Sequence, residues 1–409
     1  MFFSSPNQTI RKAFNRIFDT TPLLISLVAA LVVASVLLIA MSTDPLQAYR
    51  SMLNGAVGTE NAFAETLVKA IPILFVAVGI CVAFRGGVIN IGGEGQMIAG
   101  ALAGVSVALI ATSLPGPLII LFSLIAGFVT GALYAGIAGF LKAYFNVNEI
   151  LSTIMLNQIA VQSMNYLLNG VLLDPTEAGT NHIPKTAKIL AEAQLPRFSI
   201  TLPDAIYGAL QGLGFAGTPE LFARTRLHYG MIIAILLAVI IYMLLWRTTI
   251  GYRIRAVGEN ENASRYAGIH VPRQIILAMF IAGGCAGLAG VVQVLGLQYR
   301  LQTDGSATGF TANAGFNGIV AALFGGLNPL GAIPASAVFG GLLVGAQKMQ
   351  RDMGVPAALI TAVNGLIVIF TVSSQMFARR RARRRAANEP PRSERVLDAA
   401  VNTPMEQQT

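Results

Sequence analysis

Charged side chains are scarce in this chain of 409 residues. Only 11% of the residues are Asp, Glu, Lys or Arg, while 54% are hydrophobic; soluble domains typically contain about 25% charged residues. A core large enough to hide so much apolar surface from water is implausible, so the composition argues against a soluble domain. Apolar runs of about twenty residues, the length that crosses a hydrocarbon layer, recur along the chain and indicate a membrane protein.

Cysteine and histidine are also rare. Cys81 and Cys285 both lie in apolar segments, so neither a disulfide framework nor a metal cluster is expected. His182, His228 and His270 are scattered without the spacing of metal ligands. No segment matches the phosphate-binding pattern G-x-x-x-x-G-K-[ST], and no nucleophile–base set stands out. We therefore expect a non-enzymatic chain that binds no metal or cofactor, and any ATP must be used by a partner subunit.

Ten apolar segments predict an all-α polytopic membrane protein. The predicted helices lie near residues 22–41, 62–84, 89–113, 117–141, 148–170, 228–246, 274–297, 311–327, 331–348 and 355–377. The first apolar run is longer than the core of a signal peptide, so we expect it to be a retained helix.

The basic residues predict the orientation of these helices. With the N-terminus inside, most of the 28 lysines and arginines face the cytoplasm, as the positive-inside rule requires. The stretch ARRRARRR at 378–385 is the strongest anchor, so both termini are predicted to be cytoplasmic. The net charge of +9 then reflects topology, and we expect no binding to nucleic acid.

Two long hydrophilic segments organise the chain. The predicted parts are a cytoplasmic N-terminus (1–21), a first transmembrane half (22–170), an extracytoplasmic loop (171–227), a second half (228–377) that includes an inner segment (247–273), and a basic cytoplasmic tail (378–409) with the composition of a disordered segment. Five helices lie on each side of the outer loop. Because five is odd, the two halves would be inverted repeats, a common construction in transporters.

Small residues recur every four positions in three of the predicted spans. The sets are Gly127, Gly131, Ala135 and Gly139; Gly283 and Gly287; and Ala337, Gly341 and Gly345. This spacing lets helix backbones approach closely, so it predicts a multi-helix bundle and indicates nothing about cargo.

Polar amides follow one face of the fifth span. This face comprises Gln158, Gln162, Asn165 and Asn169. Contact between four amides and lipid would be costly, so they either join helices by hydrogen bonds or line a wet path for cargo. The eighth span adds a second set of amides and rings, Phe310, Asn313, Phe316 and Asn317.

The stretch RGGVINIGGEGQ at 85–96 separates two apolar runs. Its five glycines weaken a regular helix, and irregular backbone inside a membrane is tolerated only beside protein or a water-filled cavity. Asn90 is expected on the same helical face as Glu94, and Arg85 is near enough in sequence to neutralise Glu94 if the chain folds back. We expect Arg85, Asn90, Glu94 and Gln96 to hold a re-entrant turn, and a substrate-facing role for Glu94 stays open.

Three segments carry a family resemblance. They are FRGGVINIGGEGQM (84–97), VNEILSTIMLNQIA (147–160) and GFNGIVAALFGGLNPLG (315–331). They resemble the membrane permeases of bacterial ABC importers for branched-chain amino acids, ribose and nucleosides, and look most like the nucleoside type. Ribose-type relatives carry an aspartate-bearing segment similar to GGIDLSVG where this chain has GGVINIGGEG. The resemblance implies a translocation path for nucleosides, with simple sugars such as ribose or galactose as the alternative cargo.

The resemblance also implies partners in the bacterial inner membrane. These are a second related permease in a heterodimer, two ATP-binding subunits, and an extracytoplasmic substrate-binding lipoprotein that the loop 171–227 would contact. The inner segment 258–273, with the sequence GENENASRYAGIHVPR, resembles the cytoplasmic helix that docks on the ATPase. It lacks the full "EAA" pattern of other importers. The residues implied in coupling are Glu259, Glu261, Arg265 and Gly268.

Two other interpretations stay open. The segment 258–273 is also consistent with an ordinary solvated connector between two spans. An ion-coupled secondary transporter would use Glu94 as its coupling site. The charged inner segment argues against that class, because a secondary carrier needs no ATPase dock.

Overall fold

The computed structural model describes residues 28–29, 32–40, 42–177, 183–201, 220–356, 362 and 365–366. The chain divides into two compact units. One is Leu38–Ile360, and the other combines Met1–Leu37 with Thr361–Thr409. The predicted spans at 22–41 and 355–377 lie partly or largely outside the described residues, and the predicted cytoplasmic ends at 1–21 and 378–409 lie wholly outside them.

Helices form most of the described residues of the unit Leu38–Ile360, which confirms the predicted all-α class. The long helices are α3 (Glu60–Arg85), α4 (Gly93–Ile110), α5 (Gly116–Phe145), α6 (Glu149–Leu168), α8 (Gly230–Arg247), α11 (Val271–Gln293) and α14 (Pro329–Met353). The short ones are α2 (Pro45–Val57), α9 (Thr249–Glu259), α10 (Glu261–Tyr266), α12 (Ala307–Thr311), α13 (Ala314–Phe324) and the π-helical continuation of α11, η3 (Val294–Gln298). Strands β1 (Ile200–Thr201) and β2 (Glu220–Leu221) form one short antiparallel pair.

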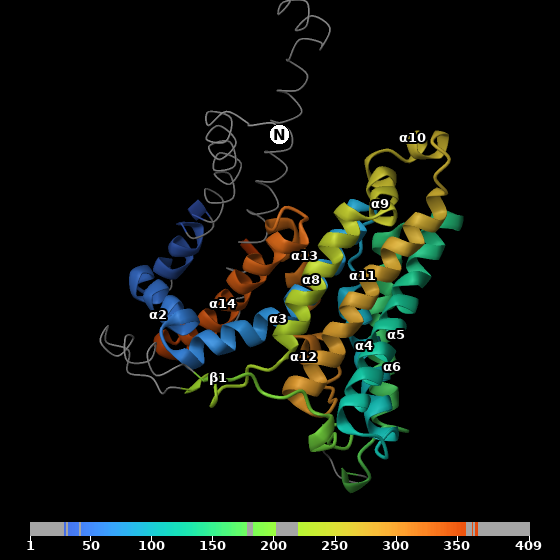
Figure 1. Cartoon of the computed structure of the whole chain (residues 1–409). Helices are drawn as coiled ribbons and strands as arrows, with labels where there is room; N and C mark the ends of the chain where they lie inside the picture. The colour runs from blue at the N-terminus through green and yellow to red at the C-terminus, as the bar shows by residue number, and fades with distance from the viewer. Residues whose placement is uncertain are drawn as a thin grey trace, which may run out of the picture. The chain divides into compact units, whose positions relative to one another are not determined.

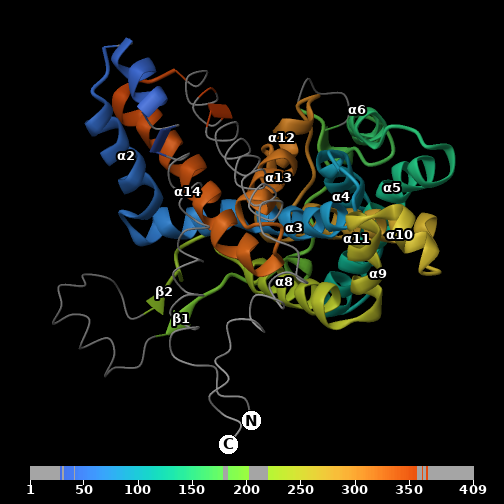
Figure 2. The same ribbon diagram turned by 90° about the horizontal axis from the view of Figure 1, so that it is seen from above.

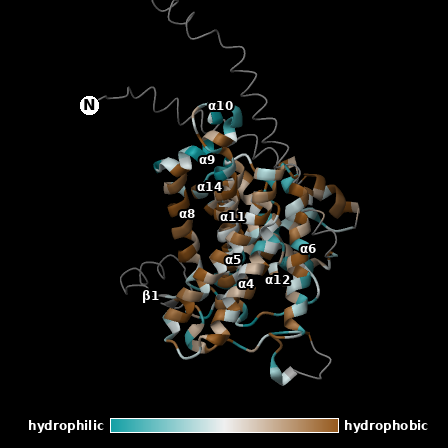
Figure 3. Cartoon of the chain, turned by 90° about the vertical axis from the view of Figure 1, so that its right-hand side faces the viewer, coloured by the Kyte–Doolittle hydropathy of each residue, from teal (hydrophilic) through white to brown (hydrophobic). Residues whose placement is uncertain are grey.

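Among the described residues, six helices are long and apolar enough to cross a membrane. They are α3, α4, α5, α8, α11 with η3, and α14. The chain is therefore a multi-pass membrane protein. In its most apolar window α3 is 83% buried, whereas α8 is 28% buried, so α3 is central. Helix α8 is hydrophobic along its length (Figure 3), and several of its large apolar side chains are exposed. The ten-helix count and the inverted repeats stay predictions.

Two predicted helix boundaries are wrong. The helix predicted over 89–113 begins at Gly93, because residues 86–92 form a turn, and Asn90 therefore shares no helical face with Glu94. The helix predicted over 311–327 is broken into α12 and α13, since Ala312 and Asn313 both have left-handed backbone (φ 50° and 61°). The short helix α2, which packs against α14 (Figure 2), was not predicted from the sequence.

Close-packed glycines join α4, α5 and α11. A side-chain carbon at Gly287 would overlap the carbonyl oxygen of Gly127, and one at Gly100 would overlap the backbone of Gly287. One at Gly131 would overlap the carbonyl oxygen of Gly283. Figure 2 shows these three helices grouped together. The prediction that the small residues bring helix backbones into contact is confirmed.

Opposite ends of this unit carry the two hydrophilic segments. Figure 1 shows α9 and α10 at one end of the bundle and the segment 183–201, with β1, at the other. The predicted orientation, with 247–273 inside and 171–227 outside, requires this separation.

Candidate functional site

The turn between α3 and α4 is closed by a ring of buried amides. The side chain of Asn90 donates to Gln96 Oε1 (3.0 Å), and Gln96 Nε2 donates back to Asn90 Oδ1 (2.9 Å). The same Asn90 oxygen accepts from the backbone N–H of Gly92 (2.9 Å). Both side chains are almost fully buried, at 1% and 2% exposure. The ring therefore fixes the glycine-rich turn to the first turn of α4 without a regular helix.

Glu94 connects the beginnings of two helices. It lies in the first turn of α4, and its Oε1 accepts from the backbone N–H groups of Gly315 (2.8 Å) and Phe316 (3.3 Å) at the start of α13. These donors have no partner within their own helix, and the positive ends of both helix dipoles favour a carboxylate there. The beginnings of α4 and α13 lie close together: a side-chain carbon on Gly93 would lie only 3.2 Å from the Gly315 Cα.

Arg85 does not neutralise Glu94, so the ion pair considered from the sequence is wrong. Its guanidinium instead donates from Nε to the carbonyl of Leu327 (3.2 Å) and from Nη2 to that of Gly326 (3.2 Å), and it lies over the Trp246 ring. The turn after Arg85 carries Glu94 to α13, whereas Arg85 stays at the end of α3 beside α8. Arg85 thus holds the turn between α13 and α14.

Asn157 of α6 is a site residue that the sequence analysis missed. It is 6% exposed, its Oδ1 accepts from the N–H of Gly95 (2.8 Å), and its Nδ2 donates to the carbonyl of Ile91 (3.1 Å). It lies one position away from the predicted amide face, so the helical spacing that selected Gln158 gave no signal for it. Asn157 anchors the polar turn to α6.

The predicted amide face of α6 is open on this single chain. Gln158 and Gln162 are exposed, and Asn165 is half-buried and accepts from the Thr303 hydroxyl (2.6 Å). Large apolar side chains share the exposed surface of the helix, among them Met155 and Ile159 (56% and 55% exposed).

The residues predicted near α13 divide into two kinds. Phe310 is 1% exposed, and its carbonyl accepts from Gln293 Nε2 (2.9 Å), so it belongs to the core. Asn313 and Phe316 are exposed, and Asn317 is half-buried. The bonds of Glu94 therefore bring the polar turn to the start of α13, where Asn313 and Phe316 are exposed.

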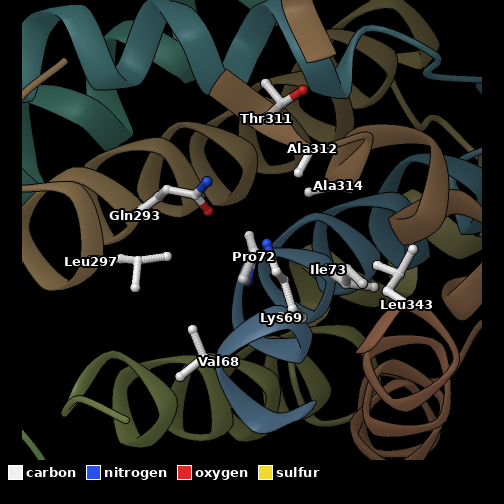
Figure 4. Close-up of a pocket in the computed structure, with 10 residues that line it drawn as sticks. All are labelled: Val68, Lys69, Pro72, Ile73, Gln293, Leu297, Thr311, Ala312, Ala314 and Leu343. Carbon is white, nitrogen blue, oxygen red and sulfur yellow. The ribbon is translucent and has the colours of Figure 1, made fainter. Parts of the chain in front are cut away.

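A small cavity adjoins this polar cluster (Figure 4). Its volume of ≈ 20 Å³ holds about one water molecule, and it is lined by α3, α11, α12, α13 and α14. Lys69 and Gln293 approach it from different sides. Thr311 also lines it, and the side chain of Thr311 forms a hydrogen bond with Glu94. Pro72 has no N–H, so the carbonyl of Val68 lacks its usual partner in α3.

Lys69 was missed although the sequence contained a signal for it. A lysine within an apolar span is costly and usually faces a polar interior, and Lys69 lies inside the predicted helix 62–84. Gln293 and Thr311 gave no such signal, since each is a single polar residue near a helix end.

The predicted coupling segment extends from the bundle on an anchored helix. Buried Gly251, Ile254 and Val257 hold α9 against its neighbours. The next helix, α10, is hydrophilic (Figure 3) and is capped by the Asn260 side chain, which accepts from the N–H of Ala263 (3.0 Å). The predicted coupling residues Glu259, Glu261, Arg265 and Gly268 are all exposed.

A bundle of apolar helices with a buried polar turn, an internal cavity and an exposed polar segment at one end has the architecture of a membrane permease. Residues 62–372 match the family described as branched-chain amino acid transport system / permease component. The chain belongs to this family of ABC transporter permeases.

The relatives of this chain are named for different substrates. The chain is 34% identical to the guanosine ABC transporter permease NupP of Bacillus subtilis, over 86% of this chain and 92% of NupP. It is 32% identical to the glucose ABC transporter permease TsgB13 of Haloferax volcanii (88% and 89%) and 31% identical to the nucleoside ABC transporter permease NupB of Lactococcus lactis (85% and 89%). No solved structure gives a significant match.

Proposed function

We propose that this chain is the nucleoside-translocating permease subunit of an ABC importer in the bacterial inner membrane. The proposal rests on two sets of polar residues, the exposed amide face of α6 and the residues at the start of α13, and α4 packs against both helices. The proposed path residues are Gln158, Gln162, Asn165, Asn313, Phe316 and Asn317, with Phe310 supporting them from the core. The names of NupP and NupB support nucleosides over the sugar alternative that TsgB13 represents.

The chemistry of these side chains suits a nucleoside. A nucleoside is neutral, flat at one end and rich in hydroxyls at the other, so it needs amides that donate and accept and a ring that covers the base. Phe316 is 49% exposed and offers such a ring. An aromatic contact contributes about 0.5–1.5 kcal/mol beyond burial and a hydrogen bond about 1 kcal/mol. These modest energies suit a transit site, which must release its cargo.

A second permease would cover the open face of α6. Two amides exposed among apolar side chains would be costly in lipid, and a related subunit packed there would convert this face into one wall of the path. We propose a heterodimer of permeases, two ATPase subunits that use the ATP, and a substrate-binding lipoprotein that contacts the segment 171–227. The chain itself would bind no cofactor.

Lys69 extends the proposed path inside the bundle. Its ammonium faces the small cavity together with Gln293, while Thr311 links that cavity to Glu94. A charged donor at this place would bind the acceptor atoms of a base or a ribose as the cavity widens during transport. Glu94 would then act chiefly on structure, because its Oε1 is used by the two N–H groups of α13.

The ATPase would dock on the exposed residues Glu259, Glu261, Arg265 and Gly268. Replacing Glu261 or Arg265 should then uncouple transport from ATP hydrolysis while the complex stays in the membrane. Normal transport after exchange of 258–270 for a Gly/Ser linker would contradict the docking proposal.

The cargo proposal is tested by uptake of labelled uridine in cells that carry the whole system. Excess adenosine or guanosine should compete, and ribose or galactose should not. Asn317→Leu should slow uptake without loss of protein from the membrane, whereas Ile319→Leu on the same helix serves as the matched control. Uptake of ribose that excess nucleoside leaves unchanged would contradict the nucleoside proposal. Uptake that survives inactivation of the ATPase subunit would favour an ion-coupled carrier.

A further inference from the structure

Two grooves meet where α9 lies against the start of α11. One has a volume of ≈ 550 Å³ and a polar lining that includes Tyr252 and His270. The other has a volume of ≈ 480 Å³ and an apolar lining. Arg253, Arg273 and Gln274 line both, so the two grooves form one continuous site with a polar and an apolar part. It lies at the end of the bundle that is predicted to face the cytoplasm.

The polar part is a cationic site without a counter-charge. Neither groove has an acidic residue in its lining. Arg253 and Arg273 are both exposed, and neither has an ion-pair partner within the part of the chain that the structure describes. Arg273 also lies in the first turn of α11, which begins at Val271, and the positive end of that helix adds to the attraction for an anion.

The apolar part begins at the same two arginines and follows α11. Ile276, Leu277 and Phe280 are half-buried along it, and Ile250 of α9 is 45% exposed on the other side. The Phe280 ring is fixed against α5, because a side-chain carbon on Gly136 would overlap it. A free phosphate ion would leave this part of the site empty, whereas a ligand with an alkyl chain fills it.

We propose that these paired grooves bind an anionic phospholipid of the phosphatidylglycerol class. Its phosphate lies between Arg253 and Arg273, and one acyl chain lies along Ile276, Leu277 and Phe280. Gln274 matches the glycerol headgroup, because its buried Oε1 has no hydrogen-bond partner in the structure and accepts from a hydroxyl. Basic pockets between helices on the cytoplasmic side of membrane proteins bind such headgroups.

The test uses the full-length chain, purified with its associated subunits, and native mass spectrometry of bound lipid. Phosphatidylglycerol should be retained well above phosphatidylcholine, which has no net charge. Retention of phosphatidylglycerol should fall about 30-fold in the double variant Arg253→Gln/Arg273→Gln. Each basic residue near the membrane surface contributes about 1 kcal/mol, which corresponds to about fivefold in affinity. Arg247→Gln, an exposed arginine at the same end of the bundle but outside both grooves, should retain it as the parent does.

Deacylated glycerophosphoglycerol and inorganic phosphate distinguish a lipid from a free anion. If either competes as well as the intact lipid, the site binds anions alone and the proposal is wrong. Equal retention of phosphatidylcholine, or loss of the ATPase subunits from the double variant with lipid retention unchanged, would also overturn it. If the double variant does not assemble, either single variant, each expected to weaken retention about fivefold, provides the same test.

Discussion

Gly258 of α9 lies directly against the backbone of Arg85 at the end of α3. A side-chain carbon on Gly258 would overlap the Arg85 carbonyl oxygen and lie 2.8 Å from the Gly87 nitrogen. Arg85 in turn holds the carbonyls of Gly326 and Leu327. The helix that ends with the proposed docking residue Glu259 therefore reaches the turn between α13 and α14 through a single residue, Arg85.

Gly258→Ala should separate α9 from the end of α3. The added methyl group has no space, and overpacking of this kind costs about 1–3 kcal/mol of stability. We expect a lower melting temperature of the purified complex and ATP hydrolysis that no longer drives uptake. Gly170→Ala is the control, because the new carbon there would meet only one atom, at 3.2 Å. Unchanged uptake and stability in Gly258→Ala would rule out this route of coupling.

Asn157→Ala and Gln158→Ala should have different effects although the residues are neighbours. Removing Asn157 leaves the N–H of Gly95 and the carbonyl of Ile91 without side-chain partners, each at about 1–3 kcal/mol. Thermal unfolding should therefore reveal a strong loss of stability. Gln158 is exposed, so its variant should remain stable and slow nucleoside uptake. A Gln158→Ala protein with normal uptake would remove this residue from the proposed path.

Lys69→Met should slow uptake at least tenfold while the protein remains in the membrane. The substitution keeps an extended side chain in the cavity and removes the charged donor, and a hydrogen bond to a charged group contributes about 1.5–3 kcal/mol. Lys69→Arg should keep part of the activity, and Arg50→Met, at an exposed position of α2 outside the proposed path, should keep all of it. Initial rates of labelled uridine uptake measure the effect, and a normal rate in Lys69→Met would exclude a role in the path.

His228 should make the stability of the protein depend on acidity. Burial lowers the pKa of this imidazole from 6.5 to about 4, and its neutral Nδ1 accepts from the N–H of Gly230 (3.1 Å). Between these pKa values the unfolded chain binds a proton that the folded chain does not. The stabilisation is therefore complete above pH 6.5 and falls by about 3 kcal/mol as the pH drops to 4.

The variant His228→Asn tests this dependence. Asn keeps an acceptor for Gly230 and does not titrate, so its melting temperature should decline less steeply between pH 6.5 and 4. Equal slopes for the variant and the parent protein would show that other groups cause the acid sensitivity.

Labelling of single cysteines should reveal the orientation. The native Cys81 and Cys285 are buried, so they should not react with a membrane-impermeant maleimide. Lys188→Cys should react in intact cells, and Asn262→Cys only after the membrane is opened; both positions are exposed. Labelling of position 262 from outside would reverse the predicted topology.

The helices were predictable because their signal is local. Long apolar runs predicted α3, α5, α8 and α14 to within a few residues. The four-residue spacing of small residues predicted that helix backbones touch, as those of α5 and α11 do. The break at Ala312 had no such signal, since neither Ala312 nor Asn313 is a glycine. The partners of Arg85 and Glu94 depend on the direction in which the turn carries the chain, which no spacing in the sequence encodes.

For the candidate site, the sequence predicted several of the residues but not how they contact one another. The sequence identified Asn90, Glu94 and Gln96 as a polar cluster, but the ring that joins Asn90 to Gln96 forms only because Asn90 precedes α4. Asn157 was not predicted, because its neighbour Gln158 and not Asn157 lies on the same helical face as Gln162 and Asn165. Lys69 was predictable, because a charged residue within an apolar span usually faces a polar interior.

The glycine contacts among α4, α5 and α11 also limit how this protein can move. Where backbones touch at Gly100, Gly127 and Gly287, sliding one helix past another would push a bulkier residue into a space that admits only a hydrogen atom. These three helices should therefore move together as one rigid body. The hinges of an import cycle are then to be sought at its borders, where the glycine-rich turn before α4 and the π-helical end of α11 allow the backbone to bend.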